Sequence, residues 1–451
     1  MAEVLVSLAQ IPEFTKLVSM QRFPSSNSAP ARPMVEAWDM FISTSSEQPP
    51  PPFEKLAFHE PMLIAFSSGT TGPPKGIVHS VGGILLNGAK ESILHEDLGP
   101  KDVVLQYTTT SWIMYLAAVL PLVSGARTVL YDGSPFYPDP ASFVNLLQEW
   151  SVTKFGTSPA WMQRLRANGI VPRDVADLSS LRLVTSTGMV LQSDLFEWFY
   201  DTAFPGHTQL FNMSGGTDIV RPGLGVPIAI LDPESSAELP STVANGQQGE
   251  LVATSSFPNV PVFFWGDLEP ASTQSKLFNS YFAKFNHKWT QGDLVSMNPV
   301  TNGVIFHGRA DGVLNPSGVR FGSAEIYGII ERRFAGEIAD SLCVGRKSKK
   351  DENESVILFL LMEPGKRFTQ EISQAVKTAI REDLSPRHVP AHIFETPDIP
   401  RTLNLKKVEV PVKRIVSGEH VKPSSTLLNP SSLEYFYQFS EVGNTFIKGK
   451  L

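Results

Sequence analysis

Short apolar runs alternate with segments of helical periodicity between residues 62 and 211, and this alternation constrains the fold more than any other feature. Short apolar runs are typical of buried strands, whereas apolar residues repeated every three or four positions, as between Ile84 and Leu94, indicate a helix. Strands that alternate with helices form βαβ units, in which the strands lie mainly parallel. The sequence therefore predicts an α/β fold, with strands at residues 62–66, 103–105, 128–130, 155–157, 181–184 and 209–211.

The pattern changes twice further along the chain. From Pro227 the segments are shorter and dominated by strands, and near Asp311 a separate region begins. That region combines a helix for which Ser323 is the expected N-cap, a buried strand over residues 356–362 and an amphipathic helix over residues 369–384. We predict a large α/β core domain and a small α+β domain, bounded as follows: a leading segment at 1–60, the core domain at 61–310, the small domain at 311–416, and at 417–451 an irregular extension with one apolar docking patch (Leu433, Tyr435, Phe436, Phe439).

The charge and cysteine content exclude several classes of protein. The 451 residues include 38 basic and 45 acidic ones, so the formal net charge is 38 − 45 = −7, and no dense basic block is present. This balance argues against a nucleic-acid or anionic-membrane partner. Cys343 is the only cysteine, which excludes an internal disulfide framework or a thiolate metal cluster and fits a reducing compartment.

The sequence contains no segment with the pattern of a membrane span or a secretory signal. The most membrane-like stretch, residues 112–123, contains Pro121 and is well short of the roughly 18–20 residues that a spanning helix needs. We expect it to be a buried core element. The N-terminal residues lack a basic region followed by an apolar one. We therefore expect a cytoplasmic protein; the alternative is a peroxisomal one, because Gly449-Lys450-Leu451 distantly resembles the S-K-L address.

The strongest local signal is the segment Ser67–Gly76, which reads SSGTTGPPKG and directly follows the strand expected at residues 62–66. Glycines let backbone N–H groups approach an anion closely, hydroxyl groups add donors, and Lys75 supplies positive charge. This combination predicts a phosphate-binding loop, which we weigh against a plain surface loop. It is not a Walker A loop, because Gly76 stands where Ser or Thr should follow the lysine.

This loop resembles the signature of the adenylate-forming superfamily, which includes acyl-CoA synthetases, peptide-synthetase adenylation domains and luciferases. Taken alone, each of the other motifs could be a plain turn or a surface charge pair. Their order across residues 60–416 nevertheless follows the family's order. The resemblance implies a large α/β domain and a small mobile α+β domain. The further segments that carry it are Asn212–Asp218, Gln291–Asp293, Gly308–Asp311, Asn315–Arg320 and Thr402–Val410.

The resemblance also implies a role for each motif residue. Lys406, Thr217 and Asp218 would be catalytic, and Asp218 would also hold Mg²⁺. Asp311 would be the hinge between the domains. Gly215 and Trp112 would line the pocket for the acid. ATP and coenzyme A would contact the remaining residues: Thr70, Thr71, Lys75, Gly188, Gly216, Asp293, Arg309, Gly318, Arg320 and Arg381.

Within the superfamily, the chain most resembles acetoacetyl-CoA synthetases, in the segments SGGTD, LVTSTGMVLQSDLFEWFY, ADGVLNPSGVRFGSAEIY and KKVEVPVKRI. The implied activity is that of a ligase that forms a carbon–sulfur bond. ATP would activate a short carboxylic acid such as acetoacetate as an acyl-adenylate, and coenzyme A would then displace AMP. A carboxylate that approaches a phosphate brings like charges together, so a lysine, Mg²⁺ and oriented N–H groups must offset the developing charge. Another short acid from a biosynthetic pathway is the alternative substrate.

Three departures from the family's pattern lead us to weigh a second function. Family members carry a longer portion before the phosphate loop, of which residues 1–60 would be a remnant. Asn404-Leu405 replace the small residues that usually precede the catalytic lysine, and the turn Thr187–Val190 lacks a proline often found there. The alternative is a shortened, catalytically impaired homologue that keeps a nucleotide pocket. A serine hydrolase is disfavoured, because no G-x-S-x-G segment occurs.

Overall fold

The chain forms two compact units, residues 1–56 and 57–451. In the N-terminal unit, β1 (Leu17–Ser19) pairs parallel with β2 (Val35–Ala37), and α2 (Trp38–Ser43) follows. The computed structural model describes these residues: 8–20, 34–43, 52–67, 75–110, 112–217, 223–233, 235, 238–267, 273, 275–310, 314, 321–347, 354–402, 406–424 and 427–440.

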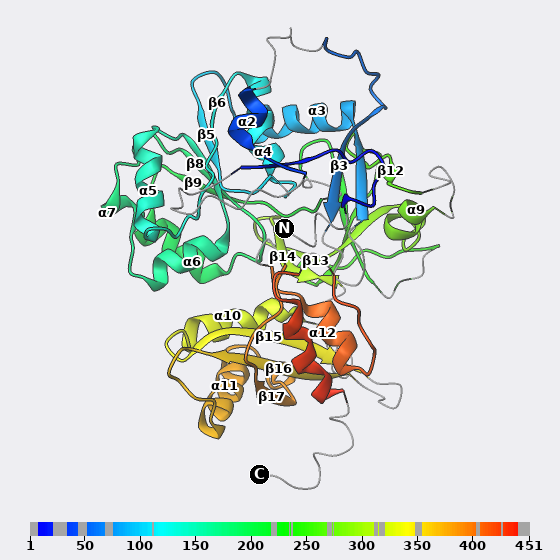
Figure 1. The fold of residues 1–451 in the computed structure, drawn as a ribbon. Helices are drawn as coiled ribbons and strands as arrows, with labels where there is room; N and C mark the ends of the chain where they lie inside the picture. The colour runs from blue at the N-terminus through cyan, green and yellow to red at the C-terminus, as the bar shows by residue number, and fades with distance from the viewer. Residues whose placement is uncertain are drawn as a thin grey trace. The chain divides into compact units, whose positions relative to one another are not determined.

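The larger unit contains a parallel sheet with the strand order β6-β5-β7-β8-β9 (Figure 1). All of its pairings are parallel. The alternation of apolar runs and helical segments therefore predicted the fold class correctly, and each strand lies within two residues of its expected position. The strands are β5 (Val103–Gln106), β6 (Arg127–Val129), β7 (Lys154–Thr157), β8 (Leu183–Ser186) and β9 (Gln209–Asn212).

Helices between these strands supply the apolar side chains that bury the sheet. Phe143, Phe155 and Trp161 form one aromatic cluster with ring centroids 5.1–6.0 Å apart. Asp139 and Ser158 begin two of the helices by accepting hydrogen bonds from backbone N–H groups in the first turn, as N-cap residues do. The helices are α5 (Pro140–Glu149), α6 (Pro159–Ala167), α7 (Pro172–Val175), α8 (Ser193–Trp198) and η3 (Phe199–Ala203).

A second sheet carries the segment that precedes the expected phosphate loop. β3 (Pro61–Ser67) pairs antiparallel with β4 (Lys75–Ser80), which pairs with β12 (Phe263–Phe264). The strand expected at residues 62–66 is confirmed, but its pairing is antiparallel rather than parallel. From β4 the chain enters α3 (Val81–Ala89), which continues as the π-helix η1 (Lys90–His95), so the helix expected around Ile84–Leu94 is also confirmed.

The apolar stretch at residues 112–123 folds as α4 (Tyr115–Val119) and the 3₁₀-helix η2 (Leu120–Ser124). The expectation that it is a buried core element is wrong for its end, because Leu122 and Val123 are 58% and 65% exposed. The physical reason is that η2 ends at the surface, where Gly125 takes a positive φ of 82° and reverses the chain. Among the described residues, no helix is long and apolar enough to cross a membrane.

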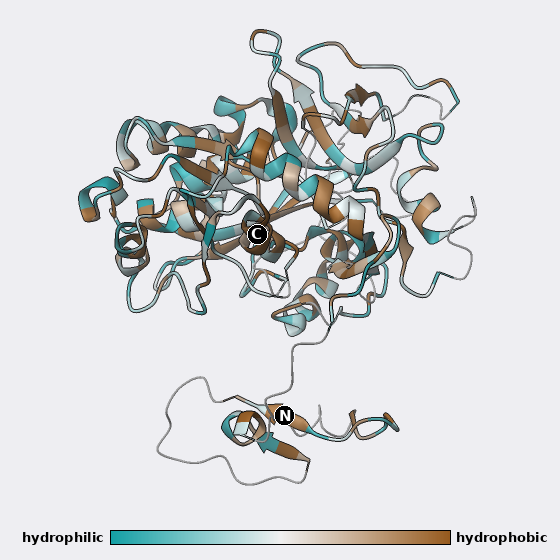
Figure 2. Ribbon diagram, turned by 90° about the horizontal axis from the view of Figure 1, so that it is seen from above, coloured by the Kyte–Doolittle hydropathy of each residue, from teal (hydrophilic) through white to brown (hydrophobic). Residues whose placement is uncertain are grey.

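The strand-dominated part after Pro227 forms a sheet with the order β10-β11-β13-β14, in which every pairing is antiparallel. Figure 2 shows hydrophobic colouring along strands inside the larger unit, with hydrophilic residues toward its outer loops. The elements are β10 (Ile228–Leu231), β11 (Gly249–Ala253), β13 (Trp289–Met297), β14 (Val304–Arg309) and the helix α9 (Lys276–Tyr281). We refer to residues 57–310 as the body.

The C-terminal region, residues 321–440, is a separate α+β layer (Figure 1). In its sheet, β16 pairs antiparallel with β15 and parallel with β17. Alternate residues along β16 enter two different apolar clusters: Leu358 packs with α10 and α11, and Phe359 packs with α12 and η7. The elements are α10 (Ser323–Arg333), β15 (Ile338–Arg346), β16 (Ser355–Met362), α11 (Gln370–Asp383), η6 (Pro386–His388), β17 (His392–Glu395), α12 (Glu409–Val416) and η7 (Pro430–Phe439).

Two expectations about this region need correction. Ser323 is not the N-cap of α10: the cap is Gly322, whose N–H donates to the Glu325 carboxylate at 3.0 Å, whereas the Ser323 hydroxyl donates to Glu409 at 2.6 Å. The extension is not irregular throughout, because η7 is a 3₁₀-helix. Its apolar patch does pack on the domain, as expected, with Leu433, Phe436 and Phe439 buried.

Candidate active site

A cavity lies at the carboxyl ends of the parallel strands, with an empty volume of about 880 Å³ that includes space open to solvent. Thr187 follows β8 directly and Met213 follows β9, and both line the cavity. This edge of an open α/β sheet is where such folds bind ligands. Further lining comes from α3 with η1 and from α4 with η2.

Trp112 lies against two other residues expected at the site, Gly188 and Lys406. Gly188 has a φ of +102°, a conformation that favours glycine, and a Cβ built on it would lie 3.7 Å from the Trp112 ring. On the same indole, the Lys406 ammonium lies 5.6 Å from the ring centroid, within the range of a cation–π contact. Trp112 and Lys406 both line the cavity, so the body and the C-terminal region meet there.

The loop after β9 supplies Gly215, Gly216 and Thr217 to the cavity. Its position is fixed from β4, because the Nε2 atom of His79 lies 2.9 Å from the Thr217 carbonyl oxygen. A carbonyl oxygen only accepts, so His79 donates this hydrogen bond through Nε2–H. The imidazole is 5% exposed. A buried histidine therefore ties the antiparallel sheet to the loop that the sequence assigns to nucleotide binding.

Lys406 and Lys407 are neighbours in the sequence but enter different environments. The Thr402 N–H donates to the Lys406 carbonyl at 2.9 Å, and Arg401 forms an antiparallel bridge with Lys407, so these two backbone positions lie side by side. Lys406 lines the cavity, whereas the Lys407 ammonium is buried 2.6 Å from Asp340 and 3.9 Å from the Tyr327 ring centroid. Burial lowers the pKa of Lys407 from 10.5 to about 8.

The buried surroundings of Lys407 form a polar cluster inside the C-terminal region. The Tyr327 hydroxyl donates to Glu409 at 2.7 Å and accepts from the Cys343 N–H at 2.9 Å. Asp340 also pairs with Arg401. Burial raises the pKa of Tyr327 and that of the Cys343 thiol well above their ordinary values, so both stay protonated. We call Tyr327, Asp340, Arg401, Lys407 and Glu409 the buried charge cluster.

Asp293 and Arg309 face each other across β13 and β14. The Arg309 guanidinium lies 3.2 Å from the Asp293 carboxylate, and Gln291 donates to the same carboxylate at 2.7 Å. Gly292, with a φ of +80°, lets the arginine approach, since a Cβ there would lie 3.3 Å from its guanidinium. Neither residue of the pair is part of the cavity lining.

Glutamine side chains of the body hold α10 of the C-terminal region. Gln163 donates to the Glu331 carboxylate at 2.8 Å, Gln192 donates to the Ala324 carbonyl at 3.1 Å, and Gln248 donates to the Glu325 carboxylate at 3.3 Å. Burial raises the pKa of Glu331. These contacts keep the two parts of the larger unit in the arrangement that places Lys406 at the cavity.

A family model described as "AMP-binding enzyme" matches residues 6–257, which is more than half of the chain. The chain belongs to the AMP-binding enzyme family. This confirms the resemblance to the adenylate-forming superfamily that the motifs carried.

Individual relatives agree with that family and with the narrower resemblance. An acetoacetyl-CoA synthetase of Gallus gallus is 40% identical over 418 residues, covering 90% of this chain and 62% of its own. A malonamoyl-CoA synthetase of Penicillium aethiopicum is 39% identical over 439 residues, covering 92% of this chain and 60% of its own. The solved structure of an acetoacetyl-CoA synthetase from Streptomyces lividans has a TM-score of 0.81 and 32% identity, covering 98% of this chain and 68% of that one. This AMP-binding enzyme thus spans about three fifths of the length of these curated relatives.

The structure gathers some of the predicted site residues and separates others. Gly215, Gly216, Thr217, Trp112 and Lys406 line one cavity, with Gly188 packed under the Trp112 ring. The predicted residues outside the described part of this AMP-binding enzyme are Thr70, Thr71, Asp218, Asp311, Gly318 and Arg320, together with Asn404-Leu405.

Lys75 and Arg381 lie outside the cavity lining. The Lys75 ammonium is 3.3 Å from the Ser280 hydroxyl and 5.3 Å from the Phe264 ring centroid. Arg381 is exposed near the end of α11. The assignment of these two side chains to nucleotide or coenzyme A contacts stays a prediction.

Sequence reasoning missed one wall of the cavity in this AMP-binding enzyme. Asn87, Glu91, Ser92 and Glu96 line it from α3, η1 and the residue that follows. We call these four residues the polar wall. No local signal marks them, because polar residues four positions apart, such as Asn87 and Glu91, look the same in sequence whether that face of the helix meets solvent or a cavity. Among the described residues, no group of acidic, histidine or cysteine side chains has a metal-binding arrangement, and the expected Mg²⁺ ligand Asp218 is not one of them.

Proposed function

We propose that the protein is an ATP-dependent acid–CoA ligase. A carboxylate oxygen of a short acid attacks the α-phosphorus of ATP, the bond to pyrophosphate breaks, and an acyl-adenylate forms. The sulfur of coenzyme A then attacks the acyl carbon, the carbon–oxygen bond to AMP breaks, the thiol proton is released, and the thioester and AMP leave.

The position of Lys406 is the observation that carries this proposal. The first step joins two anions, so it needs a cation beside the reacting phosphate. Lys406 supplies that cation to a cavity whose lining also includes the Thr217 hydroxyl and a glycine-containing loop. Its neighbour Lys407 is engaged with Asp340 inside the C-terminal region, which leaves Lys406 as the lysine of this pair that can meet a ligand.

The remaining assignments follow the family resemblance residue by residue. Asp218 would hold Mg²⁺, which supplies further positive charge to the phosphates when bound. Asp311 would be the hinge that moves Lys406 away before the thiol enters. The nucleotide would contact Thr70, Thr71, Lys75, Gly188, Gly216, Asp293 and Arg309. Gly318 would line the path of coenzyme A, and Arg320 and Arg381 would contact phosphate groups.

Acetoacetate is our reference substrate, because relatives about 40% identical carry the name acetoacetyl-CoA synthetase. Gly215 supports a chain longer than acetate, since glycine leaves room where a bulky side chain would fill the cavity. Malonamate is the second candidate, because a relative 39% identical is named a malonamoyl-CoA synthetase. We propose a cytosolic location and no nucleic-acid or membrane partner; an N-terminal fluorescent fusion that formed puncta dependent on the last three residues would contradict the location.

ATP–pyrophosphate exchange with a panel of acids tests the proposal. The panel holds acetate, propionate, acetoacetate and malonamate, with a reaction lacking acid as the blank. We expect acid-dependent exchange, and thioester formation once coenzyme A is added. If no acid raised exchange above the blank while calorimetry still detected ATP binding, the impaired nucleotide-binding homologue would replace this proposal.

A further inference from the structure

Two glycines let the body approach α10 of the C-terminal region closely. Gly328 lies in the interior of this helix, where glycine is less favourable than alanine because it loses more backbone freedom on folding. A Cβ at this position would lie 2.9 Å from the side-chain oxygen of Gln192 in the body. A Cβ on Gly322, the N-cap, would overlap the carbonyl oxygen of His307 in β14. The helix therefore lacks side chains at the places where the body contacts it.

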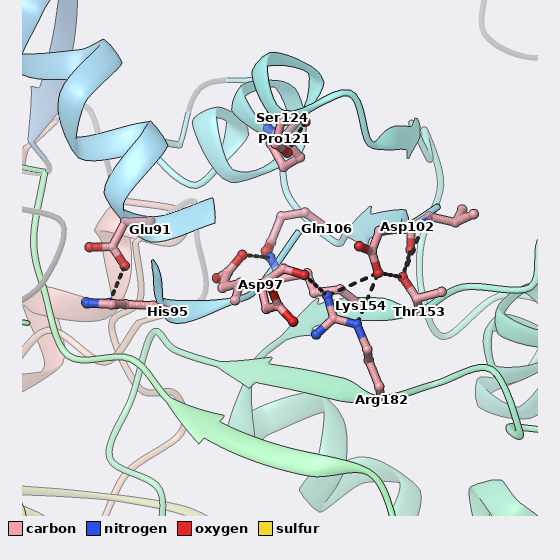
Figure 3. A network of polar contacts seen from close by, with 12 residues as sticks. Glu91, His95, Asp97, Asp102, Gln106, Pro121, Ser124, Thr153, Lys154 and Arg182 are labelled. Atoms are coloured by element: carbon pink, nitrogen blue, oxygen red, sulfur yellow. Dashed lines mark hydrogen bonds and ion pairs between the residues drawn. The ribbon is translucent and has the colours of Figure 1, made fainter. Parts of the chain in front are cut away.

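The hydrogen bonds from the body to α10 come from amide side chains, which carry no charge. Gln163 donates to the Glu331 carboxylate from α6, and Gln192 donates to a backbone carbonyl of α10. Inside the body, by contrast, the guanidinium of Arg182 lies 3.1 Å from the carboxylate of Asp102 (Figure 3). An amide that leaves its partner bonds to water and leaves no unpaired charge on the body. We call the two glutamine contacts, together with Gly328, the α10 junction.

Glu331 connects this junction to the segment that carries Lys406. Its side chain is half-buried and accepts the hydrogen bond from Gln163 at 2.8 Å. Burial raises the pKa of the Glu331 carboxyl, and the positive charge of Lys407 opposes that rise, so the two groups attract each other. Lys407 directly follows Lys406, which lines the cavity. Gln163 is not part of the cavity lining, so it acts on the cavity only through these groups.

We propose that Gln163 is a positioning residue for the first reaction step, because its contact with Glu331 holds the C-terminal region where Lys406 reaches the cavity. Gln192 and Gly328 do the same at the second contact of the α10 junction. This inference rests on the proposed function, in which Lys406 serves the first step and moves away before the thiol enters. A contact made in only one arrangement raises the share of molecules in that arrangement. Loss of the contact should therefore slow adenylate formation and spare thioester formation.

Gln163→Glu tests the contact because it places a second carboxylate against that of Glu331. Arg166, one turn further along α6, is already paired with Asp194 at 3.0 Å, so it does not neutralise the new charge. We expect acid-dependent ATP–pyrophosphate exchange to fall by about 10-fold, since like charges oppose the contact. Thioester formation from presynthesised acyl-adenylate should be unchanged or faster. General damage to the fold would instead lower both activities.

Adding Glu331→Gln to Gln163→Glu exchanges the two partners and provides a rescue. An amide again donates to a carboxylate across the same contact, so exchange should return to within about threefold of the unaltered protein. Gln148→Ala is the control, because this glutamine accepts from the Asp177 N–H at 2.7 Å inside the body. It should leave both reaction steps unchanged. A double variant no better than Gln163→Glu would overturn the inference.

Gly328→Ala tests the second contact without adding a charge. Alanine favours the helix, but its methyl group must displace the Gln192 amide, which donates to the Ala324 carbonyl. We expect slower exchange together with thermal stability that is unchanged or higher. Unchanged exchange would contradict the inference for Gln192 and Gly328.

A distance measurement supplies a readout that does not depend on catalysis. Asp174→Cys on α7 and Gln374→Cys on α11 place spin labels at exposed positions of the body and the C-terminal region, while the buried Cys343 stays unlabelled. Electron–electron resonance on the full chain then gives the distribution of distances between the labels. Gln163→Glu should add a second population of distances, and the exchanged pair should remove it.

The two readouts distinguish failure of this inference from failure of the proposed function. Exchange that Gln163→Glu leaves unchanged would overturn the inference and leave the ligase proposal standing. Absence of exchange in the unaltered protein, together with the expected change in distances, would support the role of Gln163 in holding α10 and contradict catalysis. A distance distribution that Gln163→Glu does not alter would overturn the inference as well.

Discussion

The cavity and the buried charge cluster both hold a lysine, and the two lysines are consecutive in the sequence, yet the regions treat them in opposite ways. The cavity leaves the Lys406 ammonium against an aromatic face beside a space that a ligand can enter. The cluster encloses Lys407 with Asp340 and covers it with the Tyr327 ring. A charge that must meet a substrate stays accessible, whereas the sealed and paired charge of Lys407 is disfavoured by burial, which lowers its pKa.

Replacing Lys406 gives the largest expected effect on this comparison. Lys406→Ala is expected to lower acid-dependent ATP–pyrophosphate exchange by about 10²–10³-fold, because one preorganised charge beside the reacting phosphate is lost. Thioester formation from presynthesised acyl-adenylate should be spared, and thermal stability should not change. Lys422→Ala, which alters an exposed lysine of the same region, is the control. If Lys407→Ala blocked exchange and Lys406→Ala did not, the two roles would have to be exchanged.

Filling the cavity at Gly215 tests whether the space beside this residue holds the acyl group of the acid. Gly215→Trp is expected to reduce exchange with acetoacetate by up to about 10²-fold and to shift preference toward acetate, since overpacking costs about 1–3 kcal/mol. Gly206→Trp provides the same substitution where a Cβ would meet open space. Unchanged kinetics with acetoacetate, or an unaltered protein that already prefers acetate, would contradict the assignment of Gly215 to the acid pocket.

The pH dependence of stability tests the environment of Lys407 in the buried charge cluster. Because burial lowers the pKa of Lys407 to about 8, the unfolded chain holds a proton between about pH 8 and 10.4 that the folded chain has released. Stability from this group therefore rises with pH across that window, by up to about 1.4 kcal/mol per pH unit.

Lys407→Met should remove that rise. Urea unfolding at pH 7.5 and 9.5 gives the free energy of unfolding of the unaltered protein and of the variant. The difference between the two proteins at each pH isolates Lys407, because the other titratable groups are present in both. The variant should keep most of its exchange activity. A stability difference independent of pH would show that Lys407 titrates as it does in water, and the contrast between the two lysines would weaken.

Asp293 sharpens the comparison, because it is buried and paired like Lys407 but is predicted to bind the ribose. Asp293→Asn keeps the shape and removes the charge next to Arg309. If the ribose assignment holds, calorimetry should detect an ATP affinity about tenfold weaker, the equivalent of one lost charged hydrogen bond. Asp174→Asn, at an exposed position on α7, is the control. Unchanged ATP affinity would mean that Asp293 has a structural role and does not bind the ribose.

The parts of the fold that the sequence predicted well share a physical cause. The three inner strands of the parallel sheet, β5, β7 and β8, are buried along their whole length, so apolar residues marked each of them in the sequence. Their parallel pairing followed from the helices between them. By contrast, β3 gave the same apolar signal but pairs antiparallel with β4. Met62 and Phe66 of this strand are 52% and 62% exposed. A short run of apolar residues therefore predicted a strand, but it reported neither the burial of that strand nor the direction of its neighbour.

The cavity illustrates the same limit for side chains. Residues that a motif places, such as Gly215 and Lys406, were found because spacing and order repeat in a family. Asn87 was not, because a single polar residue in a helical stretch looks alike whether it faces solvent or a cavity. Ser323 was misplaced by one residue because its hydroxyl bonds Glu409, 86 positions away, and such a partner has no local signature.

The three glutamines that hold α10 also determine how the junction responds to its surroundings. An amide side chain carries no net charge, and dissolved salt screens attraction between charges far more than it weakens a dipole in direct contact. The bonds made by Gln163, Gln192 and Gln248 should therefore persist over a wide range of ionic strength. Each of them also exchanges for a bond to water at little net expense. If Asp311 is the hinge that we propose, the rate of movement at this junction should depend little on the salt content of the cell.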